Sequence, residues 1–486
     1  MVTPNRTKIV ATLGPATDSA RMVKRLIRAG TDVFRINGAH CSPAMITQLV
    51  RLVRKVDKDM DIGIGILVDL QGPKIRVGSF VGAEPIWLQS GAQLTITTEP
   101  GVLGKAAEPG EIPRIGTRYE GLSKDVKPRD RLLLDDGNIE LRVMKVEGTE
   151  ILTKVVYGGL LKQHKGINLP GSKVSSESLT EDDLEDLDAA LRAGADYIAL
   201  SFVRTARDIQ RLREHVDAAG SDAGIIAKIE RPEAVKNIHK ILEVSDALMV
   251  ARGDLGVEIG AEMVPALQKK IIRLAVEARK PVITATQMLE SMLGNPRPTR
   301  AEASDVANAI YDGSSAVMLS GETASGKYPL QAVRIMDKII RESEKDMFAG
   351  SFARLRKDPR RGSAVTFATV RAAVYAGFEV GAKLIAVFSE SGGTALAIAA
   401  ERPSTRVIAF TPFQRTVQRL ALVWGVRAFR VPNTRTSHGM TVEGERMLRE
   451  LNLAKPGDNV VIVVGSSRQK GLTNIMHIRR IEDPGS

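Results

Sequence analysis

The chain has 486 residues, a length that indicates about three domains. Its hydrophobic content of 43% is enough to build sizeable cores, which excludes a disordered chain. No apolar run approaches the roughly 20 residues that cross a bilayer, so no membrane span is expected. The first residues lack the apolar core of a signal peptide, and Cys41 is the only cysteine, which excludes a disulfide framework and a cysteine-rich metal site. These features favour the reducing cytoplasm.

The net charge is +12, with 69 Lys and Arg against 57 Asp and Glu. Such a surplus favours anionic partners: nucleic acid, an acidic surface or phosphorylated small molecules. Residues 345–486 hold 22 basic and 11 acidic residues, a net of +11, so the first 344 residues are nearly balanced. The surplus is therefore a property of the last part of the chain.

Up to residue 340, short β-rich apolar runs alternate with amphipathic stretches. The runs predict eight strands, at 8–13, 32–36, 64–70, 197–202, 225–229, 247–251, 282–285 and 316–319. The stretches predict crossover helices, among them 21–28, 180–191, 206–216 and 265–278. Eight strand–helix units favour a closed (β/α)8 TIM-type barrel over an open sheet.

The alternation breaks between the third and fourth strands. Residues 72–173 are rich in Gly and Pro and contain alternating segments such as AQLTITTE and EILTKVVYGG, which predict an inserted all-β domain. After a charged stretch at 354–362, helix and strand patterns resume and predict a C-terminal α/β domain. The predicted division is therefore a barrel at 1–71 and 174–344, an insert at 72–173 and a C-terminal domain at 345–486.

Polar residues follow seven of the eight predicted strands, where the working residues of a (β/α)8 barrel lie. They are Arg35 and Asn37, Asp69, Ser201, Lys228 and Glu230, Arg252 and Asp254, Thr284 and Thr286, and Ser320 and Glu322. Taken singly, each of these residues is also consistent with a solvated loop residue that has no function, and residues 253–256 are also consistent with an ordinary turn. Their recurrence at seven strand ends predicts a functional site at this end of the barrel.

Lys228 and Glu230 close the fifth predicted strand. Side chains two residues apart on a strand share a face, so a cation and a carboxylate lie together. With Asp254 from the next strand, Glu230 supplies two hard oxygen ligands, a number that suits Mg²⁺ when substrate oxygens and water complete the shell. A plain Lys–Glu surface pair is the alternative.

Two familiar motifs are absent. Residues 321–327, GETASGK, fit most of a P-loop, but Tyr328 and Pro329 follow where a hydroxyl for Mg²⁺ is required. The six histidines show no metal-ligand spacing, so zinc is not expected.

A series of longer segments covers nearly the whole chain: RTKIVATLGPAT, FRINGAH, DLQGPKIRVG, KGINLPG, AKIERPEAV, MVARGDLGVEI, TATQMLESM and PTRAEASDVANAIYDGSSAVMLSGETASGKYP. In content and order they resemble the motifs of the pyruvate kinase family. The resemblance implies a barrel, a mobile β lid inserted after the third strand and a C-terminal α/β domain. It also implies phosphoryl transfer from phosphoenolpyruvate to ADP, giving pyruvate and ATP in the last step of glycolysis, with Mg²⁺ or Mn²⁺ as cofactor and a homotetrameric assembly.

The resemblance also implies roles for the strand-end residues. Glu230 and Asp254 bind the metal, Lys228 stabilises the migrating phosphoryl group, and Arg35 holds the phosphate. The amides of Gly253 and Asp254, with the Thr286 hydroxyl, take the substrate carboxylate.

Further implied contacts involve the nucleotide and the last proton. The nucleotide contacts fall on Asn37, His40, Arg76 and Lys165. Protonating the enolate of pyruvate needs an acid that the sequence does not identify, and we expect Thr286 and Ser320 to order a water for it.

One departure from the family pattern concerns potassium. Potassium-requiring members place a Ser hydroxyl two residues after the Asn and a Glu after the Gly-Pro, whereas this chain has Ala39 and Lys74. A lysine ammonium is a compact point charge that can stand in for K⁺ near the phosphates. Together with Leu70 and Gln71, Lys74 resembles the potassium-independent branch, so activity without K⁺ is predicted. The site that K⁺ occupies in potassium-requiring members corresponds here to Asn37, Asp69, Leu70 and Lys74.

A second departure lies in the C-terminal domain, where the predicted strand KLIAVFS runs into SESGGT and then a helix. Hydroxyls and free amides at a helix N-terminus form an anion site, although a turn with capping residues is the alternative. The resemblance implies a sugar-phosphate effector on Ser389, Ser391, Gly392 and Thr394. Glu390 and Gly393 stand where bisphosphate-activated members often carry cations, which favours a monophosphorylated sugar or no activator.

Two other functions stay open. Another barrel that acts on phosphoenolpyruvate or pyruvate, such as a mutase or a class II aldolase, would share the metal-binding carboxylates but leave the lid, Arg76 and Lys165 unexplained. A non-catalytic regulator that binds nucleic acid or another anion would explain the basic last third, but aromatic residues make up 4% of the chain and offer little base stacking. Neither nucleic acid nor a membrane is expected as a partner.

Overall fold

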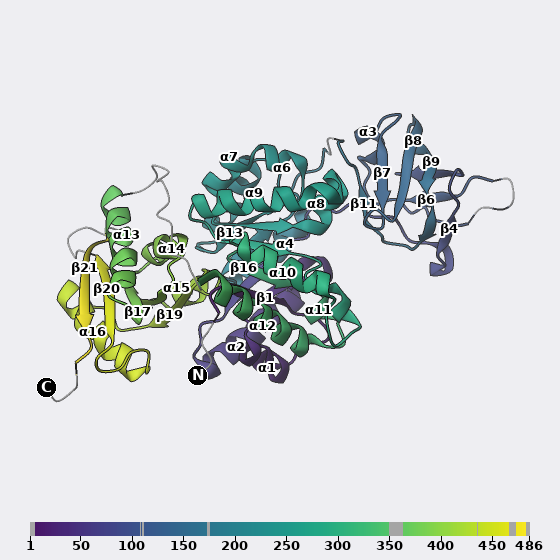
Figure 1. Ribbon diagram of the computed structural model, residues 1–486. Coiled ribbons are helices and arrows are strands. Elements are labelled where there is room, and N and C mark those ends of the chain that lie inside the picture. The colour runs from purple at the N-terminus through teal and green to yellow at the C-terminus, as the bar shows by residue number, and fades with distance from the viewer. Residues whose placement is uncertain are drawn as a thin grey trace.

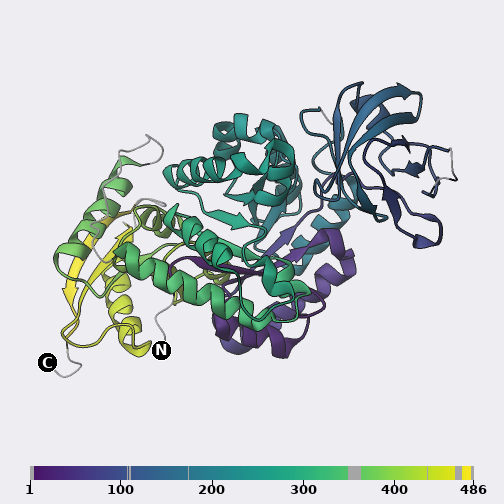
Figure 2. The ribbon, with the colours of Figure 1, turned by 45° about the vertical axis from the view of Figure 1, so that its right-hand side comes forward.

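A computed structural model describes residues 5–106, 108, 111–172, 175–348, 363–434, 436–465 and 473–482. The charged stretch predicted at 354–362 lies outside the described residues. Figures 1 and 2 show three parts in a row, with a β-rich part and an α/β part on opposite sides of a central barrel.

The central part is a closed barrel of eight parallel strands in the order β1-β16-β15-β14-β13-β12-β3-β2. The strands are β1 (Lys8–Thr12), β2 (Val33–Asn37), β3 (Gly65–Asp69), β12 (Tyr197–Leu200), β13 (Gly224–Ile229), β14 (Ala247–Ala251), β15 (Val282–Ala285) and β16 (Ala316–Leu319). The predicted barrel is therefore confirmed. β12 pairs with β3 although more than a hundred residues separate them in the chain, since the lid is inserted between them.

Helices surround the barrel: α1 (Ala20–Ala29), α2 (Pro43–Met60), α4 (Glu181–Ala193), α5 (Ala206–Ala218), α6 (Pro232–Lys236), α7 (Ile238–Val244), α8 (Arg252–Ile259), α9 (Val264–Glu277), α10 (Arg300–Tyr311), α11 (Gly321–Ala324) and α12 (Pro329–Phe348). Short 3-10 turns lie at η1 (Gly38–His40), η3 (Ala261–Met263) and η4 (Glu290–Leu293). Local sequence sets several helix starts: Thr180 and Thr299 each form a capping box with the acidic residue three positions later. The described residues include no helix that is both long and apolar enough to cross a bilayer.

Successive side chains of each barrel strand point alternately into two apolar cores. Val33, Leu67 and Ile226 belong to the cluster inside the barrel, whereas their neighbours, such as Phe34 and Ile225, pack against the outer helices. This period of two is that of a strand. It decides which strand-end side chains reach the barrel mouth.

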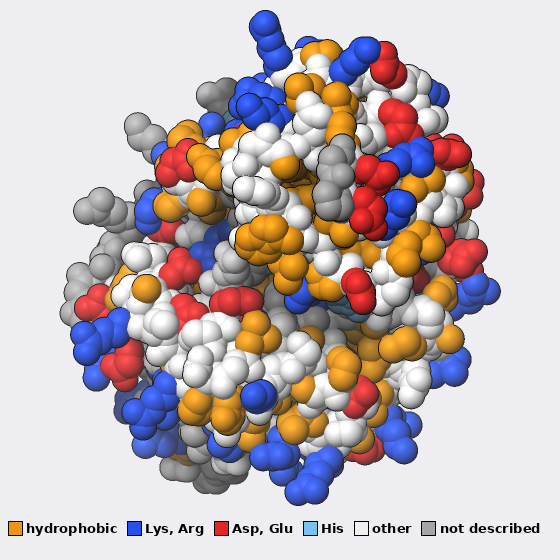
Figure 3. All heavy atoms as spheres, turned by 90° about the vertical axis from the view of Figure 1, so that its right-hand side faces the viewer, with side chains coloured by type: hydrophobic (Ala, Val, Ile, Leu, Met, Phe, Trp, Pro, Cys, Tyr) orange, Lys and Arg blue, Asp and Glu red, His pale blue; other side chains and the backbone are white. Residues whose placement is uncertain are grey.

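The inserted part is a lid of β-structure. Its strands are β4 (Ile86–Leu88), β5 (Gln93–Thr97), β6 (Arg114–Gly116), β7 (Arg131–Leu134), β8 (Ile139–Glu147), β9 (Glu150–Tyr157), β10 (Gly159–Leu161) and β11 (Ile167–Asn168), with the short helices η2 (Val81–Ala83) and α3 (Leu122–Asp125). Six strands form one sheet in the order β11-β7-β8-β9-β5-β6, and β4 pairs with β10. The lid has its own apolar core. Figure 3 views the molecule from this side and shows hydrophobic side chains interspersed with charges of both signs.

The C-terminal part is a five-stranded sheet, in the order β19-β18-β17-β20-β21, with helices on it. Its elements are α13 (Ala364–Glu379), β17 (Leu384–Phe388), α14 (Gly393–Ala400), β18 (Arg406–Thr411), α15 (Gln414–Leu420), β19 (Val426–Arg430), α16 (Ser437–Glu450), β20 (Asn459–Gly465) and β21 (Thr473–Arg480). β21 is an antiparallel edge strand that the sequence analysis did not predict.

This sheet domain closes the bottom of the barrel. Leu422 belongs to the cluster inside the barrel, and Tyr197 of β12 donates a hydrogen bond to the Arg419 carbonyl at 2.8 Å. Gly63 has a φ of 84° at this contact, and a Cβ there would lie 2.4 Å from Val417. The opposite, C-terminal end of the barrel is the end that faces the lid.

Candidate active site

The barrel mouth receives the strand-end side chains because they continue the inward-facing alternation. Ile226 lies inside the barrel, so Lys228 and Glu230 point the same way, and Asp69 likewise continues from Leu67. The structure thus brings residues from β2, β3 and β13 to one point.

Asp69 is the centre of this cluster. Its side chain is 1% exposed, and its Oδ2 accepts from Arg35 Nε at 2.8 Å while its Oδ1 lies 3.1 Å from Lys228 Nζ. Lys228 also donates to Ser201 Oγ at 2.7 Å, and Ser201 donates to the Leu70 carbonyl at 2.7 Å. The sequence analysis placed Asp69 at the cation position and missed that one carboxylate orients both predicted phosphate-binding cations.

The charges of this cluster keep each other ionised. Burial acts to raise the pKa of Asp69, but Lys228 and Arg35 outweigh it and hold that pKa below its usual value. Burial acts to lower the pKa of Lys228, but Asp69 and Glu230 raise it above its ordinary value. Lys228 is therefore an ammonium at neutral pH.

Glu230 and Asp254 form the candidate metal site. Glu230 is 1% exposed in its side chain, with Oε1 at 3.0 Å from Lys228 Nζ and Oε2 accepting from the Phe202 amide at 2.7 Å. Burial and then the neighbouring Asp254 raise the pKa of Glu230 against the effect of Lys228. Two neighbouring carboxylates fit a divalent cation. The described residues offer no cluster of three or more His, Cys, Asp or Glu for a metal, so other ligands would have to complete the shell.

The candidate carboxylate site lies where α8 begins. The Gly253 amide donates to Thr286 Oγ1 at 2.9 Å, and that hydroxyl donates to the Ala285 carbonyl at 2.6 Å. Ser320, after β16, has its amide bonded to Glu322 Oε2 at 2.7 Å. Its hydroxyl is buried and has no hydrogen-bond partner among the described residues.

The candidate nucleotide side carries a group of cations. Burial is the main cause that lowers the pKa of His40, and the positive charges of Arg76, Arg35 and Lys74 lower it further. Arg76 donates to the His164 carbonyl at 3.2 Å. In contrast, Lys165 is paired with Asp135 of the lid at 2.6 Å, a partner that the sequence analysis missed. Asn37 is the last residue of β2, directly before the 3-10 turn that contains His40.

One large cleft of about 1650 Å³ lies between lid and barrel, and several of the residues described above line it. His40, Lys74, Asp254 and Thr286 line it from the barrel side and the lid root. The lid contributes residues that sequence reasoning did not single out: Arg131, Leu133, Asp136, Gly137, Glu140 and Tyr157. The cleft can hold a substrate and a nucleotide together.

Family models match both larger parts of the chain: the pyruvate kinase barrel domain at residues 4–333 and the pyruvate kinase alpha/beta domain at residues 368–479. The chain belongs to the pyruvate kinase family. It is a phosphotransferase, as the sequence analysis predicted.

Relatives in this family match the chain along its length. A pyruvate kinase of Mycobacterium intracellulare is 43% identical over 477 residues, covering 98% of each chain, and one of Corynebacterium glutamicum is 42% identical over 479 residues with the same coverage. A solved pyruvate kinase from Cryptosporidium parvum superposes with a TM-score of 0.88 at 34% identity, covering 98% of this chain and 96% of that one. The predicted fold and family are therefore confirmed.

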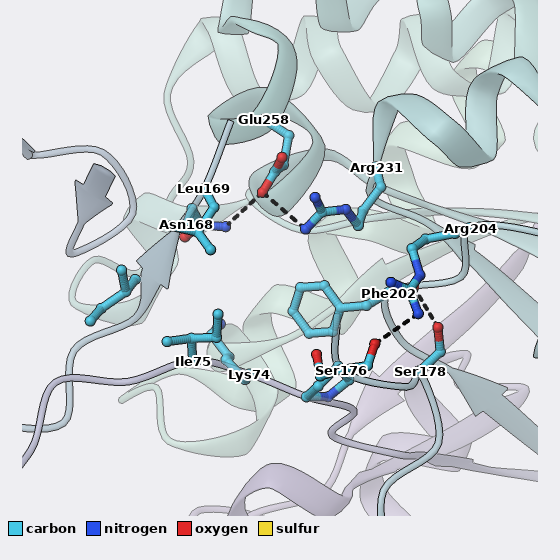
Figure 4. A pocket seen from close by; sticks show the side chains of 12 residues that line it. Lys74, Ile75, Asn168, Leu169, Ser176, Ser178, Phe202, Arg204, Arg231 and Glu258 are labelled. Carbon is cyan, nitrogen blue, oxygen red and sulfur yellow. Dashed lines mark hydrogen bonds and ion pairs between the residues drawn. The ribbon is translucent and has the colours of Figure 1, made fainter. Parts of the chain in front are cut away.

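A second, smaller pocket of this pyruvate kinase fold lies at the rim of the barrel, where the two chain segments that connect the lid to the barrel meet it (Figure 4). Arg231 follows Glu230 directly, and its Nη1 lies 3.5 Å from Oε1 of Glu258 on α8. Asn168 of the lid approaches the same oxygen at 3.5 Å. Burial raises the pKa of Glu258 against the opposing effect of Arg231. Glu258 thus connects Asn168 of the lid with the buried Arg231 of the barrel.

The candidate effector loop follows β17. Ser389 donates its amide to the Phe410 carbonyl at 3.0 Å, Gly392 has a φ of 84°, and α14 begins at Gly393. Thr394 Oγ1 lies 2.6 Å from Thr473 Oγ1. Ser391 is exposed in the same loop. The loop thus has the turn and helix start that the sequence analysis expected.

Proposed function

We propose that the enzyme transfers a phosphoryl group from phosphoenolpyruvate to ADP, giving pyruvate and ATP, with Mg²⁺ held by Glu230 and Asp254. The observation that carries the proposal is the buried cluster of Arg35, Asp69, Lys228 and Glu230 at the barrel mouth. Phosphoryl transfer needs positioned positive charge more than covalent chemistry from the protein. No observation on the site favours a mutase, an aldolase or an inactive anion-binding regulator.

Lys228 and Arg35 supply the fixed positive charge for the phosphoryl group. Both side chains are about nine-tenths buried, at 11% and 10% exposed, so their attraction for phosphate oxygens is weakly screened. Asp69 holds the two cations apart and oriented, while Glu230 adds the second counter-charge to Lys228. The cations therefore need little rearrangement when charge builds on the equatorial oxygens.

The metal would be held by Glu230 and Asp254, with oxygens of substrate and water as further ligands. When bound, a divalent cation neutralises charge on the phosphoryl and enolate oxygens. Mn²⁺ suits the same carboxylates.

The substrate carboxylate would lie on the first amides of α8, where the helix dipole favours an anion. The Gly253 amide has one proton and shares it with Thr286 Oγ1. Carboxylate binding at Gly253 therefore replaces that hydrogen bond and frees an acceptor site on the Thr286 hydroxyl, whose proton is donated to the Ala285 carbonyl. The amide of Asp254 is the second member of this site.

The same region would supply the last proton. The freed Thr286 hydroxyl and the Ser320 hydroxyl, which has no hydrogen-bond partner among the described residues, can hold a water near the enolate. The proton donor to the enolate would then be this ordered water.

ADP would lie on the lid side of the cleft, on Asn37, His40, Arg76 and Lys165. The positive charges of Arg76, Arg35 and Lys74, which act on His40, favour a polyphosphate there. The ion pair of Lys165 with Asp135 would exchange for a phosphate as the nucleotide binds.

We also propose that K⁺ is not required. Lys74 Nζ lies 3.8 Å from Oδ1 of Asp254, so its charge stands beside the proposed metal site. Asn37, Asp69 and Leu70 would form the rest of the position that K⁺ occupies in other members. The buried backbone of Leu70 already bonds Ser201 there.

In the C-terminal part we propose a sugar-monophosphate effector on Ser389, Ser391, Gly392 and Thr394. The α14 helix start supports it. Titrating sugar monophosphates against the phosphoenolpyruvate saturation curve tests it: the midpoint should fall, and an unchanged curve would remove the effector from the proposal.

Three further proposals concern organisation. The domain division at 72, 173 and 345 is supported by separate apolar cores in barrel, lid and C-terminal part, with α12 of the barrel continuing past 345 to Phe348. A homotetramer is supported by exposed apolar side chains such as Val365 and Ile478, the latter on edge strand β21. The single cysteine favours the cytoplasm.

The test of the reaction is a coupled assay in which pyruvate is reduced by lactate dehydrogenase. The proposal predicts pyruvate formation that needs phosphoenolpyruvate, ADP and Mg²⁺ together. Pyruvate formation without ADP would point to another phosphoenolpyruvate enzyme instead.

A further inference from the structure

Two consecutive residues after β15 have unusual backbone angles. Thr286 has a φ of 70° and Gln287 a φ of 53°, in the left-handed region that residues with a Cβ rarely adopt. For a β-branched residue such as Thr286 the conformation is especially unfavourable. Such backbone persists only where the surroundings determine it strongly.

The surroundings that determine this turn are mainly one side chain, Arg252. Its guanidinium donates to three consecutive carbonyls: Nε to Ala285 at 3.3 Å, and Nη2 to Thr286 at 2.7 Å and to Gln287 at 3.3 Å. The side chain is 10% exposed, and its Nη1 is fixed by Asp305 of α10 at 2.7 Å. A planar guanidinium can serve these directions at once, which an ammonium cannot do with the same geometry.

Arg252 also begins α8, so its backbone leads directly into Gly253 and Asp254. The Arg252 side chain holds the turn that contains Thr286, and the backbone that follows Arg252 carries the amides that face this turn. The Gly253 N to Thr286 Oγ1 distance of 2.9 Å is therefore set by one residue from both sides.

We propose that Arg252 is the positioning residue of the carboxylate site: it holds Thr286 in its strained conformation against the Gly253 amide. The inference rests on the proposed function, in which Thr286 and Gly253 bind the substrate carboxylate. Arg252 acts through Thr286, because its guanidinium is bonded to the turn carbonyls and to Asp305. The alternative is an arginine that only adds stability through Asp305.

The test compares R252M, T286V and the double variant R252M/T286V in steady-state kinetics. R252M should lower kcat/KM for phosphoenolpyruvate about 100-fold, the loss typical of a group displaced by about 1 Å, with KM for ADP unchanged. The double variant should be no slower than T286V, because Arg252 has nothing left to position. Free guanidinium ions should restore part of the rate of R252A.

Arg54 offers a matched control at the other end of the barrel. It also donates to two carbonyls, of Ile64 at 2.9 Å and Gly194 at 2.8 Å, and pairs with Asp196 at 2.6 Å. R54M should lower thermal stability and leave kcat/KM for phosphoenolpyruvate within twofold. A similar kinetic loss in R54M would assign the effect of R252M to general destabilisation and overturn the proposal.

A second readout does not depend on turnover. Hydrogen exchange at the Gly253 amide, followed by mass spectrometry, should be faster in R252M than in the wild type. The proposal is overturned if the kinetic losses of R252M and T286V multiply in the double variant, or if this amide exchanges at the wild-type rate in R252M. If the wild type forms no pyruvate, the proposed function fails, and the exchange measurement still decides the role of Arg252.

Discussion

The ammonium of Lys74 lies 3.8 Å from Oδ1 of Asp254, so a fixed cation stands beside one of the two proposed metal ligands. The Lys74 side chain is 27% exposed and comes from the root of the lid. A charge that the protein itself supplies does not have to be recruited from solution. This relationship supports the first prediction, that the enzyme works without K⁺.

Replacing K⁺ by tetramethylammonium at constant ionic strength should leave most of the rate. K74E should make the rate depend on K⁺, because it replaces the fixed cation by a carboxylate. The same change at Lys124, an exposed lid lysine on α3, serves as control and should leave the K⁺ response unaltered. A wild-type rate that collapses without K⁺ would show that Lys74 does not replace the ion.

Glu230 should determine metal affinity. E230Q removes one of two anionic ligands, so Mn²⁺ binding, followed by electron paramagnetic resonance of free Mn²⁺, should weaken at least tenfold. E214Q, on the exposed face of outer helix α5, is the control. Unchanged Mn²⁺ affinity in E230Q would exclude Glu230 as a ligand.

Asp186 should make stability depend on pH. Burial, and then Asp183 and Asp182, raise its pKa from 3.8 to about 6. The folded state therefore binds the Asp186 proton more tightly than the unfolded state does. The stability that this proton contributes is lost as pH rises from about 4 to 6. At pH 8 the wild type must keep an ionised carboxylate at this buried position, whereas D186N does not. The free energy of unfolding of D186N should therefore exceed that of the wild type by about 1–3 kcal/mol at pH 8.

Thermal unfolding of wild type and D186N at pH 5, 6 and 8 measures this difference. The advantage of D186N should grow between pH 5 and 6 and change little above. An advantage that is the same at all three values would mean that Asp186 titrates normally in the folded state.

The lid root should depend on the pair of Arg231 and Glu258. E258A removes the buried counter-charge of Arg231 and leaves its guanidinium with only the partly exposed Glu233, at 3.5 Å, which should cost about 3 kcal/mol in urea unfolding. The double variant R231M/E258L should recover part of that loss, since neither position of the former pair then carries a buried charge. As control, R273A on α9 breaks an exposed pair with Glu277 and should change stability by about 0–1 kcal/mol. A double variant less stable than E258A would contradict this account of the pair.

Much of the barrel could be predicted because its signals are local. Each strand is a short apolar run, and the alternation of Ile226, Lys228 and Glu230 places the last two on one face without any tertiary information. By contrast, β21, with the sequence TNIMHIRR, mixes polar and apolar residues and has no clear alternation, since it is an edge strand with exposed positions.

The supporting contacts of the site could not be predicted. Asp69 becomes the common partner of Arg35 and Lys228 only when the closed barrel brings three strands together. Asn168 and Glu258 are 90 residues apart and meet through the return of the lid. A threonine gives no indication in the sequence that its backbone is left-handed. The conformation of Thr286, and with it the role of Arg252, could therefore be inferred only from the structure.

The central claim is tested most directly by measuring pyruvate formation from phosphoenolpyruvate and ADP with and without Mg²⁺, in the wild type and K228M. The account predicts pyruvate and ATP in equal amounts, no reaction after chelation, and a loss of at least about 100-fold in K228M, because Lys228 is the buried cation at the phosphoryl site. Turnover in K228M close to that of the wild type, or pyruvate without matching ATP, would contradict it.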